Sequence, residues 1–292
     1  MKEYQYNFGG SSITVFHDEP TYSYLDHVMG ISMEEHGETW GRLGEAIVNA
    51  IVDSEGPINF MDVGTGSGVF TALVIRELCK QRDENKWGDK NFHILAIDKV
   101  PRCIEASKST ILNLLESNQC EITTETKDSG EFIFSVNNLN IQITLRCVSY
   151  SLTTCQPESV NVIFMNPPYH IYPPIMEEWI PYHARGGSYG FELFQEWLQI
   201  ASVHLKKEGL IFFHHMCLGV NKKTRIEQFV EQMNINSDFE LKLEYEYEQI
   251  GTQEFMMQVY NGYHLDFVHT VCTTFPKIYF TFGKLQKMIK KN

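Results

Sequence analysis

The sequence has few basic residues and lacks the patterns that pair cysteines or span a membrane. Its 24 Lys and Arg stand against 37 Asp and Glu, which gives a formal net charge of −13 over 292 residues. An acidic chain is repelled by phosphate backbones, so this balance argues against duplex DNA as a partner. No apolar run approaches the roughly 20 residues of a transmembrane helix, and we expect no membrane partner. The chain also contains no internal repeat and no low-complexity linker.

Cysteine and histidine are not arranged as disulfide pairs or as metal ligands. The seven cysteines are an odd number, and none of them forms a C-x-x-C pair. Together with the absence of a signal-peptide pattern, this predicts free thiols in a cytoplasmic protein. His214 and His215 are adjacent in an apolar run, and neighbouring side chains of a strand point to opposite faces. We therefore predict no metal site.

From residue 58 onward, apolar runs of strand length alternate with segments of helical spacing. This alternation is typical of a mostly parallel α/β sheet with helices on both faces. Two further alternating runs, joined by N-N-L-N, predict a β-hairpin inserted within residues 118–148. The expected strands are 58–63, 92–97, 160–165, 209–215, 239–248 and 277–283, and the expected helices are 69–80, 101–117, 191–205 and 223–233.

Two parts of the chain stand outside this alternation or at its end. Residues 1–57 predict an N-terminal extension with a strand near Ser12–Phe16 and a helix over about 38–51. The main domain then covers 58–292. Its last part, 236–292, is rich in aromatic residues, which indicates either core packing or a lid over a substrate pocket.

A glycine-rich turn follows the first apolar strand of the main domain. The stretch D-V-G-T-G-S-G-V-F contains Asp62, Gly64, Gly66 and Gly68 and leads into a helix. Glycines let the backbone turn tightly, and the N–H groups at a helix N-terminus then face a ligand. Asp98 ends the next strand, where it can accept hydrogen bonds from ribose hydroxyls. The spacing G-x-G-x-G differs from the G-x-G-x-x-G dinucleotide fingerprint, which favours a nucleoside-bearing cofactor other than NAD.

A second motif follows the strand 160–165. Asn166, Pro167, Pro168 and Tyr169 spell N-P-P-Y. In combination with the glycine turn, this tetrad resembles the class I S-adenosylmethionine-dependent methyltransferases, and among them the enzymes that methylate planar nitrogens. The resemblance implies a Rossmann-like, seven-stranded sheet and S-adenosylmethionine as cofactor.

Further residues resemble the HemK-type enzymes, which methylate the glutamine amide of peptide-release factors. Residues 184–213 are similar to the family segment after N-P-P-Y: a double glycine, another glycine, a helix, then a glycine before a strand. Residues 36–48 loosely resemble the family's P-E-T-E helix, with Glu38 and Thr39 in place. The resemblance covers about residues 36 to 235.

The resemblance implies a role for each motif residue. Asn166 would accept a hydrogen bond from the N–H₂ group that is methylated, and Pro167, which lacks an N–H, would present a backbone carbonyl to the second hydrogen. Tyr169 would cover the flat group with its ring. The remaining implied site residues are Pro168 in the catalytic tetrad, Asp62, Gly64, Gly66, Gly68 and Asp98 at the cofactor, and Glu38 on the substrate or cofactor side.

The sequence departs from the family at the adenine contact and at both ends. The family has an Asp after its third main strand, whereas Ser149 occupies that place here. The insertion at 118–148 and the C-terminal part have no family counterpart, so substrate choice is expected to lie there.

The methyl acceptor remains open at the sequence level. A protein or peptide glutamine fits the HemK resemblance best, and a small-molecule or natural-product substrate fits the departures. Nucleic-acid adenine fits N-P-P-Y but conflicts with the negative charge. A protein of a different functional class is the alternative: a cofactor-binding module that has lost its enzymatic activity because Ser149 replaces the family's Asp. A homodimer and a small activating subunit are both open.

Overall fold

The computed structural model describes residues 1–8, 11–18, 33–54, 56–83, 90–126, 131–169, 171–173, 175, 178, 185–187, 189–220, 223–251, 265–275 and 277–290. Two compact units make up the chain. The first is Met1–Met165 with His204–Lys206, and the second is Asn166–Val203 with Lys207–Asn292. Among the described residues, no helix is both long enough and apolar enough to cross a membrane.

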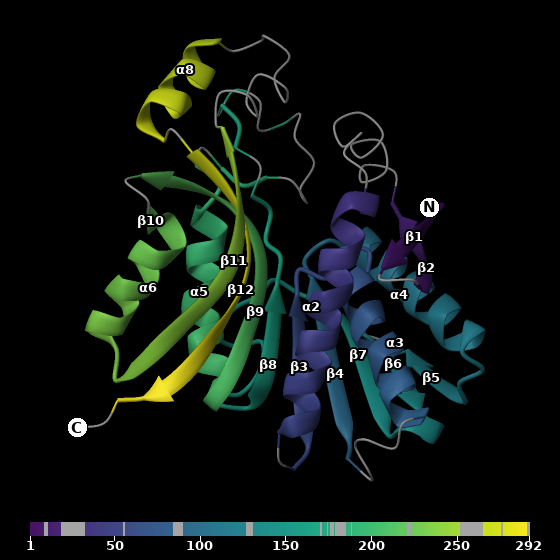
Figure 1. The fold of residues 1–292 in the computed structure, drawn as a ribbon. Helices are drawn as coiled ribbons and strands as arrows, with labels where there is room; N and C mark the ends of the chain where they lie inside the picture. The colour runs from purple at the N-terminus through teal and green to yellow at the C-terminus, as the bar shows by residue number, and fades with distance from the viewer. Residues whose placement is uncertain are drawn as a thin grey trace. The chain divides into compact units, whose positions relative to one another are not determined.

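The sheet of the first unit is built on four parallel strands. They lie in the order β8-β3-β4-β7 (Figure 1). Their bounds are β3 Ile58–Val63, β4 Phe92–Asp98, β7 Ile141–Cys147 and β8 Val160–Met165. In both β3 and β8 only the second residue, Asn59 or Asn161, is not fully buried. Uniform burial of this kind is what the continuous apolar runs predicted.

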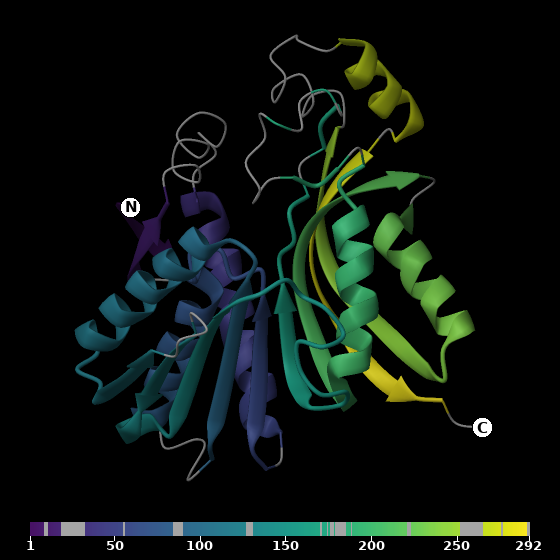
Figure 2. The same cartoon turned by 180° about the vertical axis from the view of Figure 1, so that it is seen from behind.

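Three helices pack beside one another in the first unit. They are α2 Met33–Asp53, α3 Val69–Asp83 and α4 Pro101–Ser117, and α3 contacts both α2 and α4. In Figure 1, α2 lies in front of the strands of this unit, and in Figure 2 the same strands lie in front of it. α4 begins with a proline in its first turn, where the missing N–H has no helical partner to lose.

The predicted strand near Ser12–Phe16 is confirmed as half of an N-terminal hairpin. β1 Lys2–Phe8 pairs antiparallel with β2 Ser11–His17. The hairpin packs on the helices, with β1 against α2 and β2 against α4. Phe8, Ile13 and Val15 are buried, so the extension is joined to the core of the first unit by apolar packing.

The hairpin predicted within 118–148 is present, but only part of it is an insertion. Its second strand, β7, pairs in parallel with β4 along its whole length and is therefore a core strand of the sheet. β6 Phe132–Val136 runs antiparallel to β7 through a short turn in which Asn140 has φ +50°. β5 Ile122–Thr126 adds a further antiparallel strand. The added element is thus the β5–β6 pair.

The second unit carries an antiparallel sheet in the order β9-β12-β11. Its long strands are β9 Leu205–Val220, β11 Phe239–Gly251 and β12 Lys277–Ile289, and the short β10 Lys223–Thr224 pairs with β9. The helices are α5 Glu192–His204, α6 Arg225–Asn236 and α8 Leu265–Thr274. Figure 2 shows α5 and α6 in front of these strands, and Figure 1 shows them behind.

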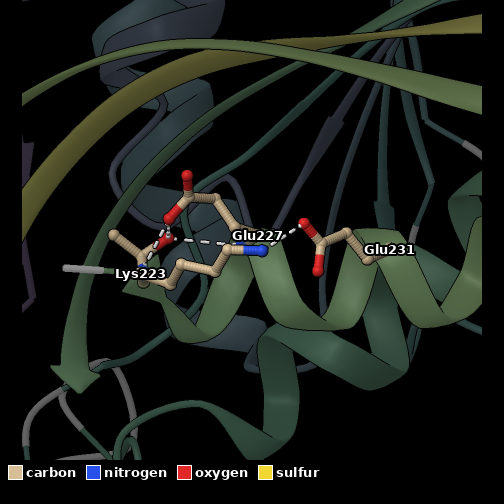
Figure 3. Close-up of polar contacts among 4 residues, drawn as sticks. Lys223, Glu227 and Glu231 are labelled. Atoms are coloured by element: carbon tan, nitrogen blue, oxygen red, sulfur yellow. Dashed lines mark hydrogen bonds and ion pairs between the residues drawn. The ribbon is translucent and has the colours of Figure 1, made fainter. Parts of the chain in front are cut away.

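α6 has a complete capping box at its N-terminus. The Thr224 hydroxyl accepts from the backbone N–H of Glu227 at 3.2 Å, and the Glu227 carboxylate accepts from the backbone N–H of Thr224 at 2.6 Å. Lys223 reaches along the helix to Glu231, 2.7 Å from Nζ to Oε1 (Figure 3). Two N–H groups that a helix start leaves unpaired are satisfied in this way.

The Rossmann-like class I methyltransferase fold predicted from the sequence is confirmed by the parallel order β8-β3-β4-β7 with helical crossovers. The seven predicted strands are present as β3, β4, β7, β8, β9, β11 and β12, and the structure adds the β5–β6 pair and the short β10. In the second unit β12 pairs antiparallel with both β9 and β11. The helix α8, which lies between β11 and β12 in the chain, was not predicted.

Candidate functional site

The glycine turn lies between β3 and α3 and is fixed by backbone hydrogen bonds. Gly64, Gly66 and Gly68 have φ of +70°, +56° and +77°. The N–H groups of Gly64 and Thr65 both donate to the carbonyl of Ile97 in β4, each at 2.9 Å. The turn is therefore tied to the end of the neighbouring strand.

Gly68 and Gly66 differ in what a side chain would meet. A Cβ on Gly68 would lie 2.9 Å from Cα of Ser107 in α4, so only glycine allows this close approach. A Cβ on Gly66 would meet nothing nearer than the Gly64 carbonyl oxygen at 4.0 Å. Gly66 thus faces open space in the first unit, which leaves room for a ligand against its backbone.

Asp62 is a buried acidic residue whose side chain is hydrogen-bonded to the turn and to α3. It is 1% exposed and accepts from the hydroxyls of Thr65 and Thr71, at 2.8 and 2.7 Å. Burial raises the pKa of Asp62 to about 6, and the two hydroxyl hydrogen bonds act against that rise. Because Thr65 is in the turn and Thr71 in α3, Asp62 joins the strand, the turn and the helix.

Asp98 ends β4 beside the turn and accepts two backbone hydrogen bonds. Gly66 N–H donates to its Oδ2 at 3.0 Å and Val100 N–H to its Oδ1 at 2.9 Å. Burial raises its pKa, and both hydrogen bonds lower it. The structure thus brings the predicted acid and the predicted glycine turn into direct contact, as expected for carboxyl ends of adjacent parallel strands.

Ser149 follows β7 at the same edge of the sheet. Cys147 is the register partner of Asp98, and Val148 N–H donates to the Asp98 carbonyl at 2.9 Å. Ser149 itself is exposed. The edge of the first unit therefore presents the glycine turn, Asp98 and Ser149 on three successive strands.

The N-P-P-Y tetrad begins directly after β8. Met165 is the last residue of β8 and the register partner of Val63 in β3, and Asn166 is the next residue of the chain. The side-chain oxygen Oδ1 of Asn166 is buried and accepts no hydrogen bond from any described residue. A buried acceptor without a partner costs about 1–3 kcal/mol, so this oxygen calls for an explanation.

Tyr169 is packed among aromatic rings of the second unit. The rings of His214 and His215 in β9 lie edge-on to it, with centroids 5.5 and 5.7 Å away. Burial raises the pKa of the Tyr169 hydroxyl. A Cβ on Gly190, whose φ is +67°, would lie 2.4 Å from the Tyr169 carbonyl oxygen. The third glycine of the segment 184–213 is thus needed for close packing against the tetrad.

Several residues around these motifs were missed by sequence reasoning. Thr65 and Thr71 carry hydroxyls toward Asp62, and Ser107 in α4 donates to the Gly66 carbonyl at 2.8 Å. His215 was considered only as a metal ligand, yet its ring lies beside Tyr169. Their contacts depend on tertiary packing, and no local pattern signals them. Glu38 lies in α2, but its side chain is outside the described residues.

The comparisons with known proteins give structural similarity only. No protein-family model and no curated protein sequence matches the chain. Among solved structures, the chain is similar to PH0793 of Pyrococcus horikoshii, with TM-score 0.49 and 9% identity over 99% of this chain and 72% of that one. It is also similar to M. jannaschii TYW2 in complex with AdoMet, with TM-score 0.46 and 11% identity over 99% of this chain and 87% of that one. A third similar structure is the [4+2]-cyclase SpnF, with TM-score 0.46 and 12% identity over 95% of this chain and 99% of that one. These similarities by themselves assign neither a substrate nor a reaction to the chain.

Proposed function

We propose that the chain is an S-adenosylmethionine-dependent N-methyltransferase that acts on an amide or another planar nitrogen. The observation that carries this proposal is the buried Asn166 Oδ1, which accepts nothing from the described residues. A buried acceptor at the start of N-P-P-Y that no described residue occupies suits an incoming N–H₂ group.

The residues of the first unit fit the nucleoside part of the cofactor. The glycine turn has an open position at Gly66 against which a ligand can lie. Asp98 is a carboxylate at the end of the adjacent strand, and its two oxygens have acceptor sites beyond the two that Gly66 and Val100 fill. We assign these sites to the ribose hydroxyls. Ser149, exposed at the end of β7, is the candidate for the adenine side.

The role of Asp62 is indirect in this proposal. Its Oδ2 accepts hydrogen bonds from the hydroxyls of both Thr65 and Thr71, and the side chain is buried. It supports cofactor binding by fixing the turn that makes the contact. Gly68 contributes through its packing on Ser107.

The bound cofactor supplies an electrophilic methyl group on a positively charged sulfur. An amide nitrogen is a weak nucleophile because its lone pair is delocalised. Asn166 Oδ1 accepts one N–H of the acceptor, and the carbonyl of Pro167 accepts the other. Both contacts strengthen as positive charge develops on the nitrogen, so they favour the transition state over the ground state. Tyr169 covers the planar group and fixes its orientation.

A protein or peptide glutamine is our first choice of acceptor. It rests on N-P-P-Y together with the segment 184–213, in which only glycine fits at Gly190 because of its close packing on Tyr169. A small-molecule acceptor is the alternative, favoured by elements such as the β5–β6 pair and the region of α8. The net charge of −13 disfavours nucleic-acid adenine.

Label transfer from S-adenosylmethionine with a radioactive methyl group tests the proposal. The purified chain is incubated with an extract of its source cells, and the product is divided into protein, nucleic acid and small molecules. Label in protein that maps to glutamine supports the first choice, and label in the small-molecule fraction supports the alternative. Cofactor binding without label in any fraction contradicts the enzymatic proposal and favours a binding module. The variant Asn166→Ala is the control for background methylation.

A further inference from the structure

Among the described contacts, a buried histidine joins the N-terminal hairpin to the glycine turn. His17, at the end of β2, is 4% exposed. Its Nδ1 shares a hydrogen bond of 2.5 Å with Oγ of Ser67, the residue between Gly66 and Gly68. Its Nε2 shares a second hydrogen bond, 2.8 Å, with the hydroxyl of Tyr6 in β1. The histidine therefore joins the hairpin to the part of the turn that is not held by β4.

The other contacts of the hairpin fix where His17 lies. The rings of Tyr4 and Tyr6 approach the imidazole edge-on, with centroids 5.4 and 5.8 Å away. The neighbouring Phe16 N–H donates to the hydroxyl of Thr110 in α4 at 3.0 Å. Asp18 pairs with Arg102 of the same helix at 3.3 Å. The residues before and after His17 are bound to α4, and both of its ring nitrogens are hydrogen-bonded. These contacts together fix the orientation of the imidazole ring.

The glycine turn needs such a support because its residues restrain themselves poorly. Glycine has the largest conformational freedom of any residue, and three of the five residues from Gly64 to Gly68 are glycines. One side of the turn is held by Asp98 and by Ser107, which bond the N–H and the carbonyl of Gly66. Ser67 is the one residue of the five whose side chain bonds to the hairpin among the described contacts.

We propose that His17 is a positioning residue for the cofactor: with Tyr6 it holds Ser67, and through Ser67 it keeps the glycine turn in the conformation that binds the nucleoside ligand. The identity of that ligand, S-adenosylmethionine, rests on the proposed function. The N-terminal hairpin is then part of the cofactor site, although none of its residues needs to touch the cofactor.

Hydrogen–deuterium exchange of the turn tests this inference without any ligand. The amides of Gly64, Thr65, Gly66 and Gly68 are all hydrogen-bonded, so their exchange reports how well the turn is held. We expect exchange about tenfold faster in His17→Ala and in Ser67→Ala, because each loses the same hydrogen bond. The double variant is expected to be no faster than either single one. Tyr6→Phe, which removes one hydroxyl only, is the milder variant and is expected to show a smaller effect in the same direction.

A matched control lies on the other face of the same hairpin. Gln5 forms hydrogen bonds to Ser12 and Thr14 at exposed positions, away from the turn. Gln5→Ala is expected to leave exchange of the turn unchanged. If His17→Ala behaves like Gln5→Ala, or if the effects of His17→Ala and Ser67→Ala add in the double variant, the inference is overturned.

Calorimetric titration with S-adenosylmethionine separates this inference from the proposed function. The expected result is binding to the unchanged protein, an affinity about tenfold lower in His17→Ala and Ser67→Ala, and partial recovery in His17→Gln, which keeps one hydrogen-bonding group toward Ser67. Absence of binding to the unchanged protein refutes the proposed cofactor, while the exchange experiment still decides whether His17 holds the turn. Normal affinity in a folded His17→Ala protein overturns the positioning role alone.

Discussion

The substitution Asn166→Ala should raise the stability of the protein while removing its activity. Oδ1 of Asn166 is buried and accepts nothing from the described residues, a state that costs the folded protein about 1–3 kcal/mol. Alanine removes that cost but also removes a few packing contacts, so we expect a net gain of about 1 kcal/mol in the free energy of unfolding. The free energy of unfolding rises only if this oxygen forms no hydrogen bond that stabilises the folded protein.

The same change should lower the rate of methyl transfer. Loss of one preorganised hydrogen-bonding group at a developing charge costs about 10²–10³ in kcat, or about 2.7–4 kcal/mol. Binding of S-adenosylmethionine should change little, since Asn166 faces the methyl acceptor in the proposed mechanism. The effect is therefore expected in kcat rather than in the cofactor dissociation constant.

Asn161 provides a matched control in the strand that leads to Asn166. It is also an asparagine of which only part is exposed, but its Oδ1 accepts from the N–H of Asn59 at 3.0 Å and from Lys206 Nζ at 2.8 Å. Asn161→Ala should therefore destabilise the protein, by about 1 kcal/mol or more, and leave cofactor binding unchanged.

Urea denaturation and single-turnover label transfer give the two readouts for both variants. The reasoning is refuted if Asn166→Ala destabilises the protein as much as Asn161→Ala does and retains its kcat. A destabilised but inactive Asn166→Ala would instead mean that the side chain holds the fold of the tetrad. A gain of stability at a cost in function is the expected signature of a side chain that serves the reaction rather than the packing of the fold.

Three further predictions follow from the site. Asp98→Ala should weaken S-adenosylmethionine binding by about 1.5–3 kcal/mol in titration calorimetry, and an unchanged affinity would contradict the ribose role. Folding raises the pKa of Asp62 from 3.8 to about 6, so the protonated side chain stabilises the fold at low pH and this contribution is lost as pH rises through 6. The free energy of unfolding of the native protein, relative to that of Asp62→Asn, should therefore fall by up to about 3 kcal/mol between pH 4 and pH 7. A difference that does not change with pH would contradict the raised pKa. Gly190→Ala should lower the stability and kcat more than Gly56→Ala does. Both glycines have positive φ (+67° and +73°), but only at Gly190 would a Cβ approach Tyr169. Equal losses in the two variants would show that the contact with Tyr169 has no effect.

Local patterns were sufficient for the core of the first unit. The predicted strands 58–63 and 160–165 and the helix 101–117 have the observed bounds, because short apolar runs bounded by turn residues and a proline at a helix start are local signals. The glycine turn and Asp98 were also found from the sequence, since parallel strands place their carboxyl ends at one edge.

Features that depend on contacts between distant segments were not predictable. The predicted hairpin was interpreted as an insertion because alternation identifies pairing partners only locally, whereas β7 is fixed by its parallel pairing with β4. The long strands β9, β11 and β12 exceed their apolar runs because their pairing partners, not their own composition, extend them. His17 showed no signal at all, since its partner Ser67 is 50 residues away.

The surroundings of Tyr169 suit a reaction that creates positive charge. A cation beside the tetrad would oppose that charge, yet two histidine rings lie within 5.7 Å of the Tyr169 ring. The pKa of His215 is lowered to about 3, mainly by burial; His214 and Arg225 act in the same direction, and a hydrogen bond with the Gly190 backbone acts against them. His215 therefore stays neutral throughout the physiological range. The nearby guanidinium of Arg225 lies over the rings of Phe191 and Tyr189, at 4.8 and 5.6 Å, so its charge is met by their π faces. The neutral His215 ring thus lies beside the ring that we propose covers the methylated nitrogen, so it adds no positive charge next to the atom on which positive charge develops.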